Sequence, residues 1–212
     1  MLKVYGFSRV NKIARGHTRD LRVLWALEEM GLPYEVVGMD HPNHDLDSPA
    51  YKALNPFGQI PAIDDDGVVV TESGAILLYL ARKSGQLMPR DLAGEAQVLR
   101  WSVAALNTIE VPLLTEWFVN MSGGKGSKPS EALHEWGAKR LKQLDGWLAD
   151  RQFIATDDFT VADILMTHVL GGGTDPAMLK PHANVLAYRT RCNERPAWKK
   201  ALAAYCERVE PA

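Results

Sequence analysis

Glu72 and Ser73 are the pair of residues in this sequence best suited to holding a charged small molecule. Both stand where the apolar pattern predicts the start of a helix, and a helix N-terminus carries unpaired N–H groups and a partial positive charge that attract a carboxylate. The carboxylate of Glu72 can pair with an ammonium group. The pair therefore suits a ligand with an ammonium and a carboxylate on one carbon, while an ordinary helix cap would use the same residue types.

Ile60 and Pro61 stand at the head of a predicted strand. Because proline has no N–H, it interrupts the hydrogen-bond ladder at this edge and leaves the backbone groups of Ile60 available. An extended peptide could then pair with Ile60 as an added strand. Taken alone, the dipeptide favours an ordinary edge strand with a trans bond, since only about 5 to 6% of X-Pro bonds in folded proteins are cis.

The elements that must position these residues form a small mixed α/β unit. Apolar patterns predict strands at residues 2–6, 34–37, 60–63 and 68–70, and helices at residues 20–30 and 72–83. The order strand, helix, strand at the start implies a right-handed parallel crossover. Asp66 and Gly67 between two apolar runs predict a hairpin, because both residue types tolerate positive φ. The whole pattern predicts a mixed sheet with helices packed on it.

Helical patterns dominate the sequence after a predicted linker at residues 85–91. They predict helices at residues 93–121, 131–150 and 161–170 and two shorter segments that follow. Thr160 and Asp163 fit a capping box, in which the hydroxyl and the carboxylate each accept a backbone N–H, so Asp163 is predicted to be structural. The fold class predicted is α/β plus all-α, with an α/β domain at residues 1–84 and an all-α domain at residues 92–212.

Composition and charge limit the classes of protein to which this chain can belong. Its 212 residues are 46% hydrophobic, which is enough to bury a core. A formal net charge of −2 provides no field for nucleic acid or anionic lipid, and no apolar run approaches the about 18 to 20 residues that span a bilayer. We therefore expect a cytoplasmic protein with no nucleic-acid partner and no membrane partner.

The only cysteines are Cys192 and Cys206, late in the chain. Their number and spacing exclude a disulfide framework and a Cys-x-x-Cys redox or zinc site. We expect two reduced, packed thiols and no metal site.

Four motifs in a fixed order give a resemblance that covers essentially the whole chain. They are Asn-Pro-Phe-Gly-Gln-Ile-Pro at residues 55–61, Thr-Glu-Ser at 71–73, Phe-Thr-Val-Ala-Asp at 159–163 and Arg-Pro-Ala-Trp at 195–198. With these motifs the chain resembles the cytosolic glutathione transferases of the bacterial type. The resemblance implies a thioredoxin-like N-terminal domain at residues 1–84 and a helical-bundle C-terminal domain at residues 92–212.

The resemblance further implies that glutathione is bound as a substrate by the elements described above. Glu72 and Ser73 would read the γ-glutamyl zwitterion, and Ile60 would pair with the peptide behind it, with a cis bond between Ile60 and Pro61. Gln59 is the candidate for the glycyl end, and a solvated loop amide is the alternative. A homodimer and a role in detoxification are also implied.

Activation of the glutathione thiol needs a group that favours the thiolate, because a free thiol has a pKa of about 8.5 and reacts as the anion. In the family a Tyr, Ser or Cys does this near the end of the first strand or the start of the first helix. Here His17 and Thr18 stand at that place, and the first domain has no cysteine. Thr18 is the first candidate and His17 the second. A helix cap is the alternative role for Thr18, and Ser8, Tyr5 and Asn11 are further donors.

The same segment is rich in basic residues. Five cations surround the single acid Asp20 between the first strand and the first turn of the helix: Arg9, Lys12, Arg15, Arg19 and Arg22. Such a cluster attracts the glutathione anion or an acidic co-substrate and stabilises a thiolate. A solvated loop and helix face is the alternative interpretation.

The function predicted from the sequence is that of a glutathione S-transferase, which conjugates the glutathione thiol to an electrophilic, apolar small molecule. A glutathione-dependent isomerase, dehalogenase or disulfide reductase remains an alternative, because one bound thiolate can serve each reaction with a different second pocket. A non-catalytic binding module on the same fold is the alternative from another class.

Overall fold

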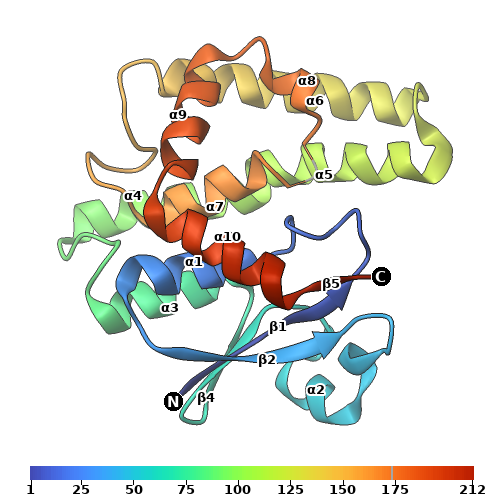
Figure 1. The fold of residues 1–212 in the computed structure, drawn as a ribbon. Coiled ribbons are helices and arrows are strands. Elements are labelled where there is room, and N and C mark those ends of the chain that lie inside the picture. The colour runs from blue at the N-terminus through green and yellow to red at the C-terminus, as the bar shows by residue number, and fades with distance from the viewer. Residues whose placement is uncertain (173) are drawn as a thin grey trace. The chain divides into compact units, whose positions relative to one another are not determined.

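The computed structural model describes residues 1–172 and 174–212 of the chain. Its main sheet contains the strands β1 (Leu2–Val10), β2 (Tyr34–Asp40), β3 (Ala62–Asp65) and β4 (Val68–Thr71) in the order β2-β1-β3-β4. β1 and β2 are parallel, whereas β3 is antiparallel to both β1 and β4 (Figure 1). The predicted mixed sheet is confirmed, and so is its hairpin, in which Asp66 and Gly67 both have positive φ.

Helices cover both faces of this sheet. α1 (Asp20–Met30) and α3 (Ser73–Ser84) lie together on one face (Figure 1). α2 (Pro49–Leu54) follows the short 3-10 turn η1 (Asp45–Asp47), and its Tyr51 ring lies 5.7 Å from the ring of Tyr5. Since side chains alternate along a strand, Tyr5 and the fully buried Val4 face opposite sides of the sheet, so α2 covers the face that α1 and α3 leave open.

α1 has the bounds that the sequence predicts. Its C-terminal residue is followed by Gly31, which has φ of 63° and whose N–H bonds back to the carbonyls of Leu27 and Glu28. A glycine in this left-handed conformation is the most common way to end a helix. All the apolar residues of α1 are buried, and Leu24, Trp25 and Leu27 are among the largest side chains of this core.

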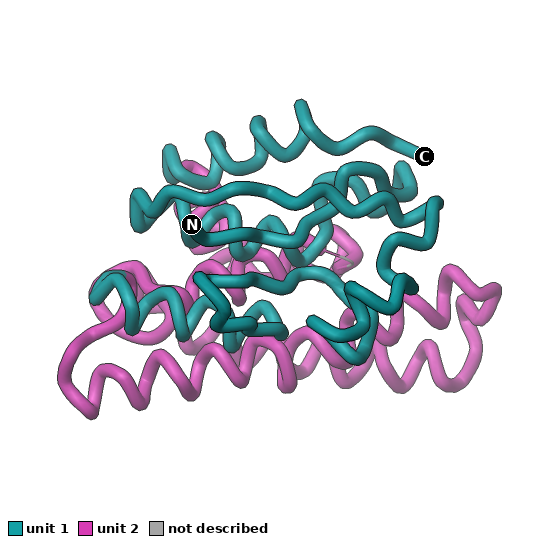
Figure 2. Tube along the Cα trace, turned by 90° about the horizontal axis from the view of Figure 1, so that it is seen from below, with its two compact units in different colours: residues 1–86, 195–212 teal, residues 87–194 magenta. Residues whose placement is uncertain are grey.

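Contacts divide the chain into two compact units (Figure 2). Unit 1 contains residues 1–86 together with residues 195–212, and unit 2 contains residues 87–194. Within unit 1, α10 (Pro196–Arg208) packs on α1, and the rings of Trp25 and Trp198 lie 4.8 Å apart. These units are defined by contacts, whereas the predicted domains at 1–84 and 92–212 rest on sequence pattern, so the domain boundaries stay a prediction.

The end of the described chain departs from the expectation of an all-α second half. β5 (Glu210–Pro211) pairs in parallel with Arg9 and Val10 of β1. In addition, the N–H of Ala212 donates to the carbonyl of Val10 at 2.9 Å. A two-residue strand has no periodicity that a sequence pattern could show, which explains why this pairing was not predicted.

In the part of unit 2 that the structure describes, the regular elements are helices and helical turns. Its elements are α4 (Leu92–Val103), the π-helical turn η2 (Ala104–Ile109), α5 (Glu110–Val119), the π-helical turn η3 (Asn120–Gly124), α6 (Lys128–Trp147), α7 (Val161–Val169), α8 (Pro176–Leu179) and α9 (Ala183–Asn193). The prediction of a helix over residues 93–121 was wrong in that the π-helical turn η2 interrupts it, while η3 begins at its end. Pro112 lacks the N–H that would bond to the carbonyl four residues earlier, and η2 changes the hydrogen-bond spacing just before it.

The predicted capping box at the start of α7 is confirmed. The backbone N–H of Asp163 bonds to the Thr160 hydroxyl oxygen, and the Thr160 N–H donates to Asp163 Oδ2 at 2.8 Å. Asp163 also accepts from the Ile154 N–H at 2.8 Å and from the Tyr188 hydroxyl at 2.9 Å. Burial raises the pKa of Asp163, and these bonds to its carboxylate oppose that rise.

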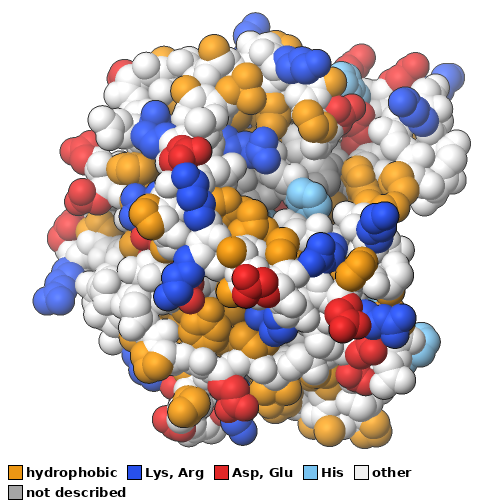
Figure 3. Space-filling model, in the orientation of Figure 1, with side chains coloured by type: hydrophobic (Ala, Val, Ile, Leu, Met, Phe, Trp, Pro, Cys, Tyr) orange, Lys and Arg blue, Asp and Glu red, His pale blue; other side chains and the backbone are white. Residues whose placement is uncertain are grey.

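On the face drawn in Figure 3, basic and acidic side chains are interspersed among apolar ones. Cys192 is buried and Cys206 half-buried, and the two form no disulfide. Over residues 1–172 and 174–212, the structure has no helix both long enough and apolar enough to cross a membrane.

Candidate functional site

The start of α3 is built around Glu72 and Ser73. Glu72 is exposed and occupies the N-cap position with φ of 68° and ψ of 116°, a backbone conformation that non-glycine residues rarely adopt. Such strained positions cluster at ligand-binding sites, where the surrounding structure holds them in place. Ser73 is the first residue of the helix and is 4% exposed, so its hydroxyl is shielded from bulk water.

Arg22 lies behind Ser73 in the interior of unit 1. It belongs to α1, is 1% exposed, and its Nη1 donates to the Ser73 hydroxyl oxygen at 3.1 Å. The sequence pattern places Arg22 in a basic cluster that is either solvated or anion-binding, and the structure shows that this residue is not solvated. The burial of Arg22 could have been predicted from its position among Leu21, Val23 and Leu24, because a cation on the apolar face of a helix is buried together with hydrogen-bond partners.

The predicted cis bond between Ile60 and Pro61 is confirmed. The carbonyl oxygen of Gln59 accepts from the Tyr51 hydroxyl and from Asn55 Nδ2, each at 2.7 Å, so the backbone before the cis bond is held by two donors. The side chain of Gln59 is exposed. Within the described part of the chain, the N–H and carbonyl of Ile60 make no hydrogen bond, which leaves them available to an added strand.

The β3–β4 ladder brings the two predicted binding elements together. Ala62 is paired with Thr71, and the two strands are antiparallel. Pro61, which precedes Ala62, and Glu72, which follows Thr71, therefore lie at the same end of the ladder. Neighbouring strands lie about 4.8 Å apart. The strand edge at Ile60 and the helix start at Ser73 are therefore adjacent, although they stand thirteen positions apart in the sequence.

Thr18 and His17 lie in different environments on the segment that leads into α1. Thr18 is 9% exposed, and its hydroxyl donates to the hydroxyl of Tyr205 at 2.7 Å. His17 is exposed. Thr18 is not the N-cap of α1, because that position belongs to Arg19, which makes no side-chain cap hydrogen bond.

Asp20 is a buried carboxylate that the sequence pattern did not single out. It is fully buried in the first turn of α1, and its Oδ2 accepts from the Phe7 N–H of β1 at 3.0 Å. A Cβ atom at Gly6 would lie 2.8 Å from the same oxygen, so only glycine fits there. Burial raises the pKa of Asp20, while its hydrogen bonds with Thr18 and Phe7 oppose the rise.

The Asp20 network lies at the same end of the sheet as the strand edge. Tyr5 pairs with Ala62 at the end of the β1–β3 ladder, so Gly6 and Phe7 continue from that end on one strand. Pro61 continues from it on the other. Because Phe7 bonds to Asp20, the start of α1 lies near the elements that hold Ile60 and Ser73.

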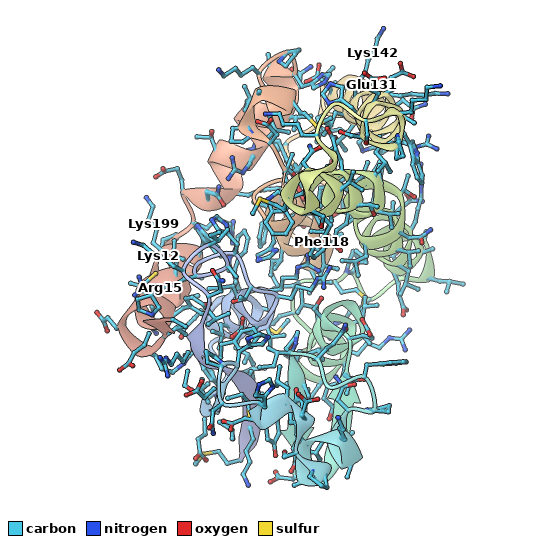
Figure 4. The ribbon with its side chains drawn as sticks, turned by 90° about the vertical axis from the view of Figure 1, so that its right-hand side faces the viewer. Lys12, Arg15, Phe118, Glu131, Lys142 and Lys199 are labelled. Carbon is cyan, nitrogen blue, oxygen red and sulfur yellow. The ribbon has the colours of Figure 1, made fainter. Side chains whose placement is uncertain are left out.

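The other residues of segment 5–22 that the sequence suggested for thiol activation or anion binding make different contacts. The Tyr5 ring packs against Tyr51 in a small core on the α2 side of the sheet, and the side-chain oxygen of Asn11 accepts from the Ile13 N–H at 2.9 Å. Arg15 donates to backbone carbonyls of the C-terminal segment, and Figure 4 shows Arg15 and Lys12 beside α10. The predicted basic cluster is therefore partly consumed by internal contacts.

Side chains that could ligate a metal do not cluster in the described part of the chain. No set of three or more His, Cys, Asp or Glu side chains in residues 1–172 and 174–212 is placed to hold a metal ion.

Two family models match the chain. The model of the glutathione S-transferase N-terminal domain matches residues 13–82, and the model of the glutathione S-transferase C-terminal domain matches residues 124–196.

Individual proteins of known name are similar to the chain over most of its length. Glutathione S-transferase F9 of Arabidopsis thaliana is 30% identical over 197 residues, which cover 87% of this chain and 92% of the plant protein. The disulfide-bond oxidoreductase YghU of Escherichia coli (strain K12) is 32% identical over 195 residues, covering 85% of this chain and 67% of the bacterial protein. A glutathione transferase from Burkholderia graminis, solved with two glutathione molecules bound per protein subunit, aligns with a TM-score of 0.83 and 27% identity, covering 96% of this chain and 88% of that one.

Proposed function

Because this chain belongs to the glutathione S-transferase family, we propose that it conjugates the thiol of glutathione to an electrophilic, apolar small molecule. The observation that carries the proposal is the adjacency of two binding elements at one end of the β3–β4 ladder. One is the strand edge at Ile60, whose backbone groups are available, and the other is the start of α3 at Ser73. A γ-glutamyl peptide presents matching groups to both.

Glutathione binding follows from the chemistry of these elements. The peptide pairs with the backbone of Ile60 beside Pro61, and Gln59 provides an exposed amide for the glycyl end. The γ-glutamyl carboxylate lies at the N-terminus of α3, where it accepts from backbone N–H groups and from the Ser73 hydroxyl. The ammonium pairs with Glu72.

Arg22 supports this arrangement from behind. Its guanidinium donates to the Ser73 oxygen, so the hydroxyl proton of Ser73 remains available for the carboxylate of the ligand. The guanidinium is always charged, and in the interior its field favours an anion at the start of α3.

Thiol activation is assigned to the neighbouring residues Thr18 and His17. The Thr18 hydroxyl is engaged with Tyr205 and Asp20 inside unit 1, which favours a supporting role for it. His17 is exposed next to it, and an imidazole can accept the thiol proton or, when protonated, stabilise the thiolate by charge. The contacts therefore favour His17 as the group that reaches the sulfur.

A homodimer that acts in the cytoplasm in detoxification is the corresponding biological setting. Unit 2 exposes large apolar side chains along α4, α5 and the turn after it, at Val103, Val111, Phe118 and Met121, of which Figure 4 labels Phe118. Exposed apolar surface of this kind supports contact with a second copy. Two cysteines that form no disulfide are in keeping with a reducing compartment.

Reduction of a disulfide by glutathione is a second candidate function. The similarity to a disulfide-bond oxidoreductase and to a glutathione transferase with two bound glutathione molecules favours it over isomerisation and dehalogenation. In this reaction the bound thiolate attacks one sulfur of the disulfide, and a second glutathione then resolves the mixed disulfide. No protein cysteine is required for these two exchange steps.

Calorimetric titration with glutathione, followed by turnover assays, tests both functions. We expect saturable binding, and consumption of an electrophile with loss of one thiol per product. Reduction of a disulfide without conjugation of any electrophile would select the second function. Binding without either turnover would leave a binding module, and absence of binding at millimolar glutathione would refute both enzymatic proposals.

A further inference from the structure

The segment that precedes α1 is tied to the C-terminal part of unit 1 by long-range hydrogen bonds. Thr18 donates to the hydroxyl of Tyr205, which is 187 positions later in the sequence. Arg15 Nε donates to the Val209 carbonyl at 2.7 Å, and Arg15 Nη2 donates to the Cys206 carbonyl. The backbone hydrogen bonds of residues 11–17 are short-range turns, so these contacts are what fixes the segment against the rest of the unit.

Tyr205 is itself held firmly. It is fully buried in α10, the helix that packs on α1, and the guanidinium carbon of Arg208 lies 5.7 Å from its ring centre. Burial is the main cause that raises the pKa of Tyr205 to about 12, so its hydroxyl stays neutral at physiological pH. A neutral, buried phenol of this kind keeps its proton and can hold a neighbouring hydroxyl in place by a hydrogen bond.

The hydroxyls of Thr18 and Tyr205 form one chain with the carboxylate of Asp20. Thr18 bonds to both partners, Asp20 from α1 and Tyr205 from α10, and it stands next to His17. The charged and titratable groups around this hydrogen-bond network are Asp20 on α1, Arg208 on α10, and Arg15 and His17 on the preceding segment. This hydrogen-bond network therefore connects α10 to the place where the thiol of glutathione is proposed to lie.

We infer that Tyr205 is a positioning residue for thiol activation, which holds Thr18 and through it the orientation of His17. This inference rests on the proposed function, because it concerns the same site. The binding elements at Ile60 and Ser73 are held by other contacts, so loss of the Tyr205 hydroxyl would leave glutathione affinity unchanged while it changes the thiol pKa.

Tyr205→Phe tests this inference, with Tyr188→Phe as the matched control. Both tyrosines are fully buried, and both hydroxyls bond to a side chain near the start of a helix, Tyr188 to Asp163 in unit 2. Each substitution removes one buried hydroxyl and keeps the ring. A purely structural effect would therefore lower the unfolding temperature of both variants and change the chemistry of neither.

Glutathione binding is measured first by calorimetry, and the thiolate of bound glutathione is then titrated by its ultraviolet absorbance. For Tyr205→Phe we expect the midpoint of thiol ionisation to rise by about one pH unit, since a hydrogen bond and one unit of pKa have similar free energies. We expect a dissociation constant within about twofold of wild type, and no shift of the midpoint for Tyr188→Phe.

The outcomes separate this inference from the proposed function. If wild-type protein does not bind glutathione, the proposed function fails and the inference fails with it. If wild type binds and ionises the thiol but Tyr205→Phe has the same midpoint, only the positioning role is refuted. A midpoint that shifts equally in Tyr188→Phe would also refute it, because the shift would then follow stability. Retention of the wild-type midpoint in Thr18→Ser, which keeps the hydroxyl, is expected alongside.

Discussion

Two buried hydrogen-bond networks in this protein contain the same three residue types, but they differ in whether both carboxylate oxygens accept hydrogen bonds. In unit 2, Asp163, Thr160 and Tyr188 meet at the start of α7, and the carboxylate accepts four hydrogen bonds. In unit 1, an aspartate, a threonine and a tyrosine meet at the start of α1, but Oδ1 of the aspartate accepts no hydrogen bond from the residues that the structure describes.

The difference between these networks fits a structural role for the first and the proposed functional role for the second. A carboxylate whose bonds are complete stabilises the fold and has no capacity left for a ligand or a water molecule. The incomplete carboxylate, Asp20, lies beside the residues proposed to activate the thiol. Each unsatisfied buried polar group calls for an explanation, and the one offered for Oδ1 of Asp20 is its position beside the proposed activators.

The largest effect is expected from Asp163→Ala. This change leaves the N–H groups of Ile154 and Thr160 and the hydroxyl of Tyr188 buried without their acceptor, which should lower the free energy of unfolding by about 3 to 5 kcal/mol. Denaturant unfolding measures the loss. Glutathione affinity of the folded variant should equal that of wild type, and a large change in affinity would contradict the structural assignment.

A loss of ligand affinity is expected from Ser73→Ala, which extends the comparison to the start of α3. Here a buried hydroxyl is paired with a cation, Arg22, in place of a carboxylate. Loss of a hydrogen bond to the charged γ-glutamyl group should cost about 1.5 to 3 kcal/mol, which weakens binding roughly 10- to 150-fold. Ser84→Ala, at the other end of the same helix, is the control in calorimetry and should bind as wild type does. Equal affinity for all three proteins would place the ligand elsewhere.

Thr18→Val should destabilise unit 1 by about 1 to 3 kcal/mol, because it removes the hydroxyl shared by Asp20 and Tyr205 while keeping the shape of the side chain. Thr18→Ser retains the hydroxyl and should recover most of that stability. Thermal unfolding of the two variants checks this difference. If valine and serine have the same effect, the hydroxyl chain contributes nothing to the fold of unit 1.

The smallest effect is a change in the slope of stability with pH, and it isolates Asp20. Burial raises the pKa of Asp20 above its ordinary value of 3.8, so the folded state holds a proton that the unfolded state has released. Stability from this group is therefore greatest below pH 3.8 and falls as pH rises through the raised pKa. Asp20→Asn removes the titration, so the stability of wild type relative to the variant should decline as pH rises from 3.8. Urea unfolding at a series of pH values measures this difference, and a relative stability that increases over the same range would contradict the assignment.

One of the two networks is predictable from the sequence and the other is not. Thr160 and Asp163 are three positions apart on one helix start, so local spacing alone indicates the capping box. Thr18 and Tyr205 are 187 positions apart, and their contact depends on α10 packing against α1, for which no local pattern exists. Threonine before a helix was therefore interpreted as a possible cap, whereas Arg19 is the N-cap.

Elsewhere the same distinction holds between local and long-range information. The bounds of α1 and the hairpin after β3 follow from Gly31 and from Asp66-Gly67, which act on their own backbone. The cis bond before Pro61 was predicted from the family resemblance of the seven-residue motif at residues 55–61. The burial of Arg22 was not predicted, because its charge left a solvated position open, whereas its neighbours on α1 are buried. The π-helical turns near Pro112 and the pairing of β5 with β1 depend on packing that a periodic pattern does not contain.

The return of residues 195–212 to unit 1 has a consequence for biosynthesis. A chain made from its N-terminus exposes the first 86 residues while α10 and β5 do not yet exist, and the whole of unit 2 must be translated in between. At about 5 to 20 residues per second, this interval is roughly 5 to 20 seconds. During that time Thr18 lacks Tyr205, and the edge of β1 at Val10 lacks its partner strand. The region proposed to activate glutathione is thus the last part of the first unit to be completed on the ribosome.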